Sequence, residues 1–147
     1  MNVSDFYESR GQEEIKSHIK SLFILAATDG DLHRKELKMI YSIGMEYGVP
    51  EEQLTQIFKE EGNASDYQKP QTVRKKIEHI FDLILVMMAD GEMKRDELIT
   101  AKKIAALMDI SEKDFEEILD MMNELTLITH DKEEIVTHIE NGMGHRI

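Results

Sequence analysis

The chain has 147 residues, enough for one domain with a single core, and it carries 30 acidic against 18 basic side chains. Its net charge of −12 argues against nucleic acid and anionic membranes as partners, because both attract clustered Lys and Arg. The absence of Cys excludes disulfides, thiolate chemistry and Cys-type zinc sites. The acidic, polar start lacks the pattern of a secretory signal, and the apolar runs are too short to span a membrane, so we expect a cytoplasmic protein.

Apolar residues recur at helical spacing almost throughout the chain, and no segment alternates convincingly with the period of a strand. In chain order, the apolar stripes fall within residues 15–26, 37–44, 54–58, 73–84, 98–108, 115–122 and 135–139. The β-prone stretch Leu125–Thr129 is too short and isolated to form a sheet. We predict a single all-α domain over residues 12–142, a compact bundle of about seven helices. Glu61–Pro70 is its main linker, and we expect flexible ends at residues 1–11 and 143–147.

An internal repeat is the most informative feature of the sequence. Residues 19–61 align without a gap with residues 80–122, and about ten of the 43 pairs are identical. Each copy reads as helix, tight turn, helix, short turn, helix. The helices before the two tight turns are apolar nearly all round, so we expect them at the centre of the domain and in contact. The prediction is two pseudo-symmetric three-helix repeats followed by a C-terminal helix.

The element that recurs is DGDLHRKEL at Asp29–Leu37 and DGEMKRDEL at Asp90–Leu98, and we refer to these two segments as the DG turns. Their Gly, apolar and Glu positions fit the sixth, eighth and twelfth places of an EF-hand calcium loop. The first and third places of such a loop should supply oxygen ligands. They hold Leu25 and Ala27 in the first copy, and the second copy is apolar there too, so we reject a standard EF-hand.

A structural interpretation accounts for much of the motif. The Gly of each DG turn can adopt positive φ just after a helix. If His33 and Lys94 cap the following helices, Glu36 and Glu97 stand at the third helical position, where a carboxylate can reach back to the backbone N–H of the cap. His and Lys do not accept the reciprocal bond as Ser or Thr would, so the capping box is half-formed.

A functional interpretation starts from charge density. Asp29 and Asp31 lie together in the first DG turn, and Asp90 and Glu92 lie together in the second. If the pseudo-symmetry brings the two turns together, their carboxylates would favour a hard divalent cation. Because the ligands are oxygens, calcium or magnesium suits the site better than copper does. The residues leave both interpretations open.

An apolar helix followed by D-G-x-apolar-x-x-x-E-L, present twice in an all-helical chain of this size, resembles the TerB family of tellurite-resistance proteins. The resemblance spans Glu13 to Asn141, and it implies a seven-helix bundle with internal pseudo-two-fold symmetry. It also implies a role in tellurite and general stress resistance, metal binding at the symmetric turns, and action within larger membrane-associated complexes. Members commonly have Ser or Thr where this chain has His33 and Lys94. Carried over residue by residue, the candidate metal ligands are Asp29, Asp31, Glu36, Asp90, Glu92 and Glu97.

Two histidines stand at equivalent positions of the repeat, His18 and His79. His18 is about three helical turns from Asp29, roughly 16 Å at the helical rise, so the two cannot share a metal within one helix. We interpret His18 as a surface or partly buried residue, with Glu14 as an ordinary surface partner at i,i+4 spacing.

Enzyme signatures are missing from the chain: it has no Gly-x-Ser-x-Gly elbow, Walker loop or dinucleotide Gly fingerprint. We therefore expect a non-enzymatic TerB-like stress-response module that binds a divalent metal ion at its acidic DG turns. The alternative is a protein–protein interaction scaffold whose DG turns are purely structural. Both hypotheses imply a protein partner or complex, without nucleic acid and without direct membrane insertion.

Overall fold

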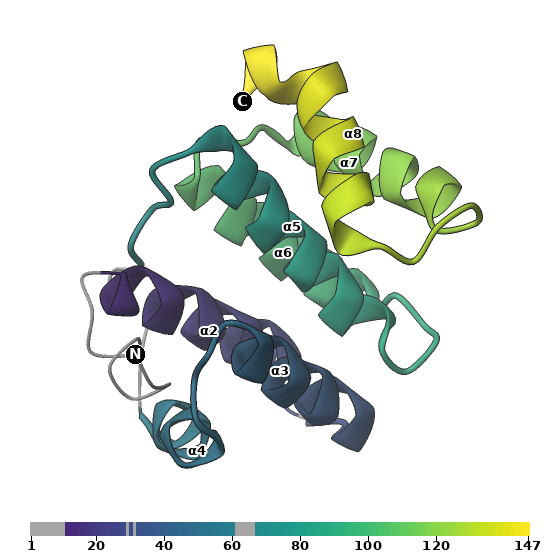
Figure 1. Cartoon of the computed structure of the whole chain (residues 1–147). Helices are drawn as coiled ribbons and strands as arrows, with labels where there is room; N and C mark the ends of the chain where they lie inside the picture. Colours follow the sequence, from purple (N-terminus) through teal and green to yellow (C-terminus); the bar gives the residue numbers. More distant parts are fainter. Residues whose placement is uncertain (1–10, 29, 31, 61–66) are drawn as a thin grey trace.

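The structure, a computed structural model, describes residues 11–28, 30, 32–60 and 67–147. These residues form seven α-helices and one 3-10 turn, with no strand among them (Figure 1). In chain order the elements are α2 (Gln12–Ala26), α3 (Arg34–Glu46), α4 (Glu51–Lys59), α5 (Val73–Met88), α6 (Arg95–Leu107), α7 (Glu112–Leu125), α8 (Lys132–Met143) and η2 (Gly144–Arg146). The predicted all-α bundle is confirmed.

Local signals in the sequence determine where several helices begin and end. Thr72, Ser111 and Asp131 precede α5, α7 and α8, and each side chain accepts a hydrogen bond from a backbone N–H of the first turn, at 3.1, 3.1 and 2.9 Å. Such caps satisfy donors that the helix itself leaves unpaired. Gly30 and Gly91 adopt positive φ, 77° and 85°, shortly after α2 and α5, where a larger side chain would be strained. The expected role of both glycines is confirmed.

Helices α2 and α5 pack against each other at the centre of the bundle, as the sequence predicted (Figure 1). α2 also contacts α3, α4 and α6, and α5 also contacts α3, α6, α7 and α8. Ile19 and Leu22 of α2 and Ile80 and Leu83 of α5 are completely buried. Each such side chain contributes about 1.5–3 kcal/mol to stability through removal of apolar surface from water. The central helix pair is therefore the main part of the core.

The helices recur at the spacing of the sequence repeat. α5, α6 and α7 begin 61 residues after α2, α3 and α4 respectively. α2 packs against α3 and α4 as α5 packs against α6 and α7, and α2 contacts α6 as α5 contacts α3. Positive φ also recurs, at Gly48 (89°) and Asp109 (61°). The final helix, α8, packs against α5 and α7.

The two segments predicted as flexible ends differ in what the structure describes. Met143 is buried at the end of α8, and Arg146 of η2 forms ion pairs with Glu117 and Asp114, the latter at 3.9 Å. Residues 1–10 lie outside the described residues, as do residues 61–66 of the predicted linker. None of the described helices has the length and apolar character needed to cross a membrane.

Candidate metal centre

Residues of the two DG turns meet in space. His33 is the N-cap of α3 and Lys94 is the N-cap of α6, the positions that the sequence predicted for them. The ammonium of Lys94 donates a hydrogen bond to Nε2 of His33, so two equivalent positions of the repeat are in direct contact.

Three side chains at this contact have the geometry to hold a cation. A nitrogen of His33 and carboxylate oxygens of Glu36 and Asp90 all lie within 4.8 Å of one another. Glu36, in the first turn of α3, is fully buried, whereas His33 and Asp90 are half-buried. Asp90 follows α5, so the group combines ligands from both DG turns. Within the described ranges, it is the one group of three or more His, Asp or Glu side chains this close together.

The surroundings of Asp90 stabilise its charged form. The backbone N–H of Glu92 donates to Oδ1 at 3.1 Å, and Nζ of Lys94 lies 3.6 Å from Oδ2. The backbone hydrogen bond first, and then the nearby Lys94 and His33, lower the pKa of Asp90 below its ordinary value. The carboxylate is therefore ionised at neutral pH, as metal binding requires. Lys94 meanwhile places a positive charge where a metal ion would also be attracted.

The other four predicted ligands are not members of this group as the structure describes it. Glu97 stands in α6 at the position equivalent to Glu36, and only 1% of its surface is exposed. Glu92 is exposed, and its contribution to the group is the backbone hydrogen bond to Asp90. Asp29 and Asp31 lie outside the described residues. Of the four predicted acids that the structure describes, Glu36 and Asp90 belong to the three-residue group.

The third member of the group, His33, was not predicted as a ligand. The sequence indicated a poor helix cap in place of the usual Ser or Thr. The signal that could have revealed His33 as a ligand is the presence of His where a Ser or Thr cap is usual. Imidazole is a side chain of a type that can ligate metals, and here it stands at a cap position, three residues before Glu36, inside an acidic turn.

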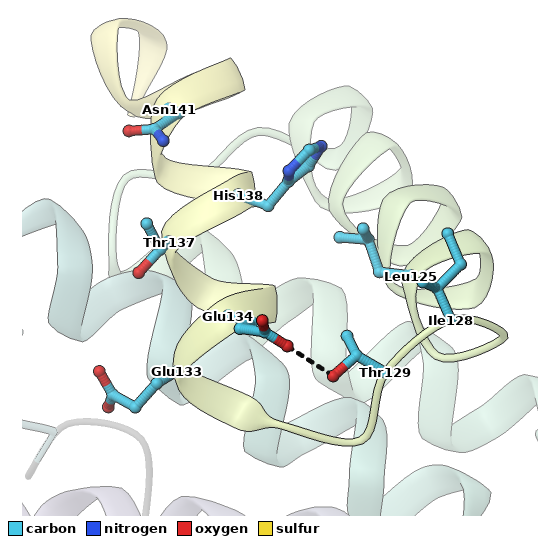
Figure 2. A pocket seen from close by; sticks show the side chains of 8 residues that line it. All are labelled: Leu125, Ile128, Thr129, Glu133, Glu134, Thr137, His138 and Asn141. Atoms are coloured by element: carbon cyan, nitrogen blue, oxygen red, sulfur yellow. Dashed lines mark hydrogen bonds between the residues drawn. The ribbon is translucent and has the colours of Figure 1, made fainter.

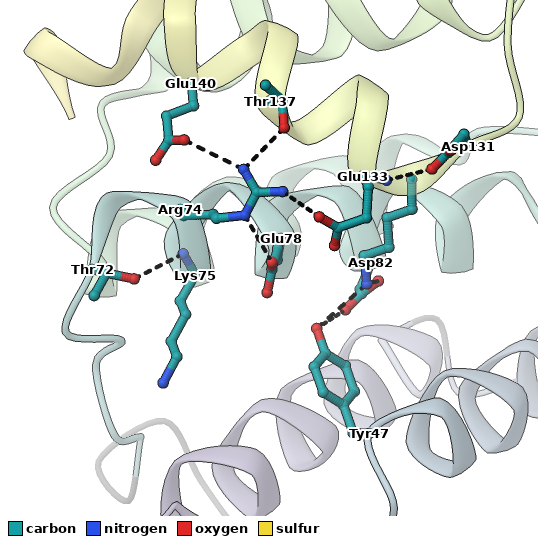
Figure 3. A network of polar contacts seen from close by, with 11 residues as sticks. Tyr47, Thr72, Arg74, Lys75, Glu78, Asp82, Asp131, Glu133, Thr137 and Glu140 are labelled. Carbon is teal, nitrogen blue, oxygen red and sulfur yellow. Dashed lines mark hydrogen bonds and ion pairs between the residues drawn. The ribbon is translucent and has the colours of Figure 1, made fainter.

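A second polar cluster is buried between the helices and was missed at the sequence level. Asp82 of α5 is completely buried, and its Oδ2 accepts hydrogen bonds from His18 at 2.8 Å and from the Tyr47 hydroxyl at 2.7 Å. Lys132 of α8 donates to Oδ1 at 3.0 Å. Figure 3 shows Tyr47 reaching Asp82 from the end of α3. Burial alone would raise the pKa of Asp82. The opposite effect of His18, Lys132 and Tyr47 is larger, so the pKa lies below its ordinary value and the carboxylate is charged.

The two equivalent histidines stack across the contact of α2 and α5. The ring centroids of His18 and His79 are 3.6 Å apart and the rings are 7° from parallel. Burial, followed by the charges of His18 and Lys132, lowers the pKa of His79 well below its ordinary value. The prediction that His18 lies at or near the surface is wrong, because the packing of α5 on α2 encloses it and Asp82 supplies its partner.

Comparison with protein-family models, with curated proteins and with solved structures gave no match for the chain. What the structure establishes is a class: an all-α bundle that brings His33, Glu36 and Asp90 together where its two DG turns meet. The case for a function therefore depends on this geometry and on the sequence.

Proposed function

We propose that the chain is a non-enzymatic, cytoplasmic stress-response module of the TerB type, which binds a divalent cation where its two DG turns meet. The observation that carries the proposal is the placement of His33, Glu36 and Asp90, with ligand atoms within 4.8 Å of one another. Two of these residues belong to the first DG turn and the third belongs to the second. Cation binding would therefore link the two turns and stabilise their contact.

The proposal includes an arrangement of two three-helix repeats about a pseudo-two-fold axis. Near such an axis, a residue touches its own equivalent. Two pairs of equivalents do so: His18 stacks on His79, and His33 is hydrogen-bonded to Lys94. The matching helix starts and the matching contacts of α2, α3 and α4 with those of α5, α6 and α7 support the same arrangement.

The donor set favours particular cations. Carboxylate oxygens suit calcium and magnesium, which the acids alone predicted. The imidazole of His33 adds a nitrogen donor, which extends the set of suitable ions to manganese and zinc. Three protein ligands leave further positions around any of these ions for water, since calcium, magnesium and manganese take six or more ligands and zinc commonly takes four.

One observation favours the alternative function, an interaction scaffold with purely structural turns. The ammonium of Lys94 contacts His33 and lies 3.6 Å from Asp90, so a protein cation already neutralises part of the group. In that case the DG turns would be stable without metal. The acidic surface of the chain would then be its functional part.

Calorimetric titration of the chelator-stripped full chain with Ca²⁺, Mg²⁺, Mn²⁺ and Zn²⁺ tests the proposal. We expect one ion to bind per chain, and Asp90→Asn to weaken that binding at least tenfold because a charged ligand is lost. Glu92→Gln is the matched control: it removes one carboxylate from the same turn, lies outside the three-residue group, and should leave the affinity within about twofold. Absence of binding by all four ions, or equal binding by Asp90→Asn, would contradict the proposal and leave the scaffold.

A further inference from the structure

The turn between α7 and α8 carries an unusual pair of side chains. Leu127 and Ile128 are 88% and 82% exposed, whereas the next most exposed large hydrophobic side chain among the described residues, Met45, is 56% exposed. Singly exposed apolar residues are ordinary on protein surfaces. Here the two are adjacent in one turn and Ile128 also lines a hollow, which together indicate a contact surface.

Such a hollow lies directly beside this turn (Figure 2). Leu125 and Ile128 line one side, and the face of α8 from Glu133 to Asn141 lines the other. We call it the α7–α8 groove. Its volume is about 570 Å³, and the hydrogen bond from Thr129 to Glu134, at 2.7 Å, joins the two sides at one end. The α8 side spans roughly two helical turns, or about 12 Å, which matches the length of a short helical segment.

The helices that border the α7–α8 groove are rich in acidic residues. Residues 112–141 hold ten Asp and Glu side chains against two Lys. Six of the ten acids are paired with Arg74, Lys102 or Arg146 from outside this stretch, among them Glu133 at 2.6 Å and Glu140 at 3.3 Å from Arg74 (Figure 3). The ion pairs of the described residues do not involve Glu124 or Glu134.

We propose that the α7–α8 groove binds a basic amphipathic helix of a partner protein. Apolar side chains of that helix would pack on Leu125, Leu127 and Ile128, and its Lys or Arg side chains would face Glu124 and Glu134. An apolar strip bordered by carboxylates is complementary to such a helix in both shape and charge. The surface uses none of the metal-centre residues, so it is a function separate from cation binding.

Charge argues against the two other occupants of an apolar surface. A second copy of this chain would bring an equally acidic surface to the groove, and like charges repel at short range. An anionic lipid surface would be repelled for the same reason. The same negative charge that repels a second copy and an anionic lipid surface attracts a basic helix.

The test begins with selection from a display library of random 16-residue peptides on the immobilised full chain. We expect the enriched peptides to combine Lys or Arg with Leu, Ile or Phe at i,i+3 and i,i+4 spacing. The strongest peptide is then titrated by fluorescence anisotropy. The double variant Leu127→Ser, Ile128→Ser should weaken binding at least tenfold, since the contact buries both side chains. Ile99→Ser is the matched control, because Ile99 is a 44% exposed apolar residue of α6 that belongs neither to the groove nor to the turn between α7 and α8.

Leu127 and Ile128 are almost fully exposed, so the double variant should melt within a few degrees of the unchanged chain, and a thermal scan of it and of Ile99→Ser verifies that both fold. Absence of enrichment, enrichment of acidic peptides, or equal binding by the double variant and Ile99→Ser would overturn the proposal. Two other results would also overturn it: a dimer seen in sedimentation, or binding to phosphatidylcholine–phosphatidylglycerol vesicles, if the double variant abolishes either one. Asp90→Asn should leave peptide binding unchanged, which separates this result from the metal proposal.

Discussion

Lys94 is the residue on which the two interpretations of the DG turns differ most. Its ammonium contacts His33 and lies 3.6 Å from Asp90, so it would lie next to any metal ion that these two residues bind. A structural turn needs this charge to balance the carboxylates. A metal-binding turn must accommodate it beside a second, divalent charge.

Replacing Lys94 by Gln should therefore change metal affinity and stability in opposite directions. A unit charge about 4 Å from a divalent ion costs roughly 2 kcal/mol even at the dielectric constant of water, so Lys94→Gln should tighten Ca²⁺ or Mn²⁺ binding by about tenfold or more. Without metal, the acids of the group lose a counter-charge and the melting temperature should fall. Calorimetry and thermal scans measure both effects. Arg95→Gln, which removes a neighbouring exposed cation, should do neither. Unchanged metal affinity in Lys94→Gln would mean that no ion binds beside Lys94.

The sequence revealed some residues of the candidate site because their signal was local. Glu36 and Asp90 were predicted as ligands from the acid content and the repetition of a short motif. His18 and Asp82 were not linked, because 64 residues separate them and only the packing of α2 on α5 brings them together. Periodicity places a residue on a face of its helix, but it does not identify the polar partner on another helix.

At the scale of the elements, helix starts were more predictable than helix contacts. The N-caps of α3 and α6 and the positive φ of the DG turns followed from known local chemistry. The close approach of α3 and α4 did not. Gly44 reads as one small residue within the apolar stripe of α3, but a Cβ at this position would collide with the buried side chain of Leu54 in α4.

Gly44→Ala should destabilise the protein although alanine favours helices. The gain in helix propensity is about 1 kcal/mol, and overpacking against Leu54 costs about 1–3 kcal/mol, so we expect a net loss of up to about 2 kcal/mol. Urea unfolding measures the change. The equivalent position in α6 is Ala105, which is fully buried, and Ala105→Gly should cost about 2 kcal/mol because it loses both helix propensity and a buried methyl group. The pair Gly44→Ala, Leu54→Ala should show non-additivity, because the smaller side chain removes the collision. A stabilised Gly44→Ala would mean that α3 and α4 separate easily.

At the scale of the whole molecule, the contact between the two halves of the chain combines apolar packing with buried polar groups. α2 and α5 bury their aliphatic side chains against each other, and the same contact encloses the His18–His79 stack and Asp82. The composition predicted a single core but not these charges within it. A carboxylate in such a core is stable because His18, Tyr47 and Lys132 all donate to it.

This contact makes global stability depend on pH, and the sign follows from His79. Its pKa in the folded protein is lowered well below 6.5, chiefly by burial and then by the charges of His18, Lys132 and Lys75. Below about pH 6.5 the unfolded chain binds a proton that the folded protein excludes. The free energy of unfolding should therefore fall by up to about 1.4 kcal/mol per pH unit as the pH decreases from 6.5 toward the folded pKa, and this contribution should be constant above 7.

Urea unfolding of the full chain at pH 7.5, 6.5 and 5.5 measures this dependence. His79→Leu removes the titrating group, together with an Nδ1 that has no hydrogen-bond partner among the described residues, and it should flatten the profile over this range. His138→Leu is the control, because His138 is exposed on α8, and it should keep the slope of the unchanged chain. Asp82, whose pKa is lowered from 3.8, contributes stability above that value and loses it only at lower pH, so it cannot produce the effect. If His79→Leu kept the full slope, the proton would bind elsewhere, and the stacked pair would not control the stability of the contact between α2 and α5.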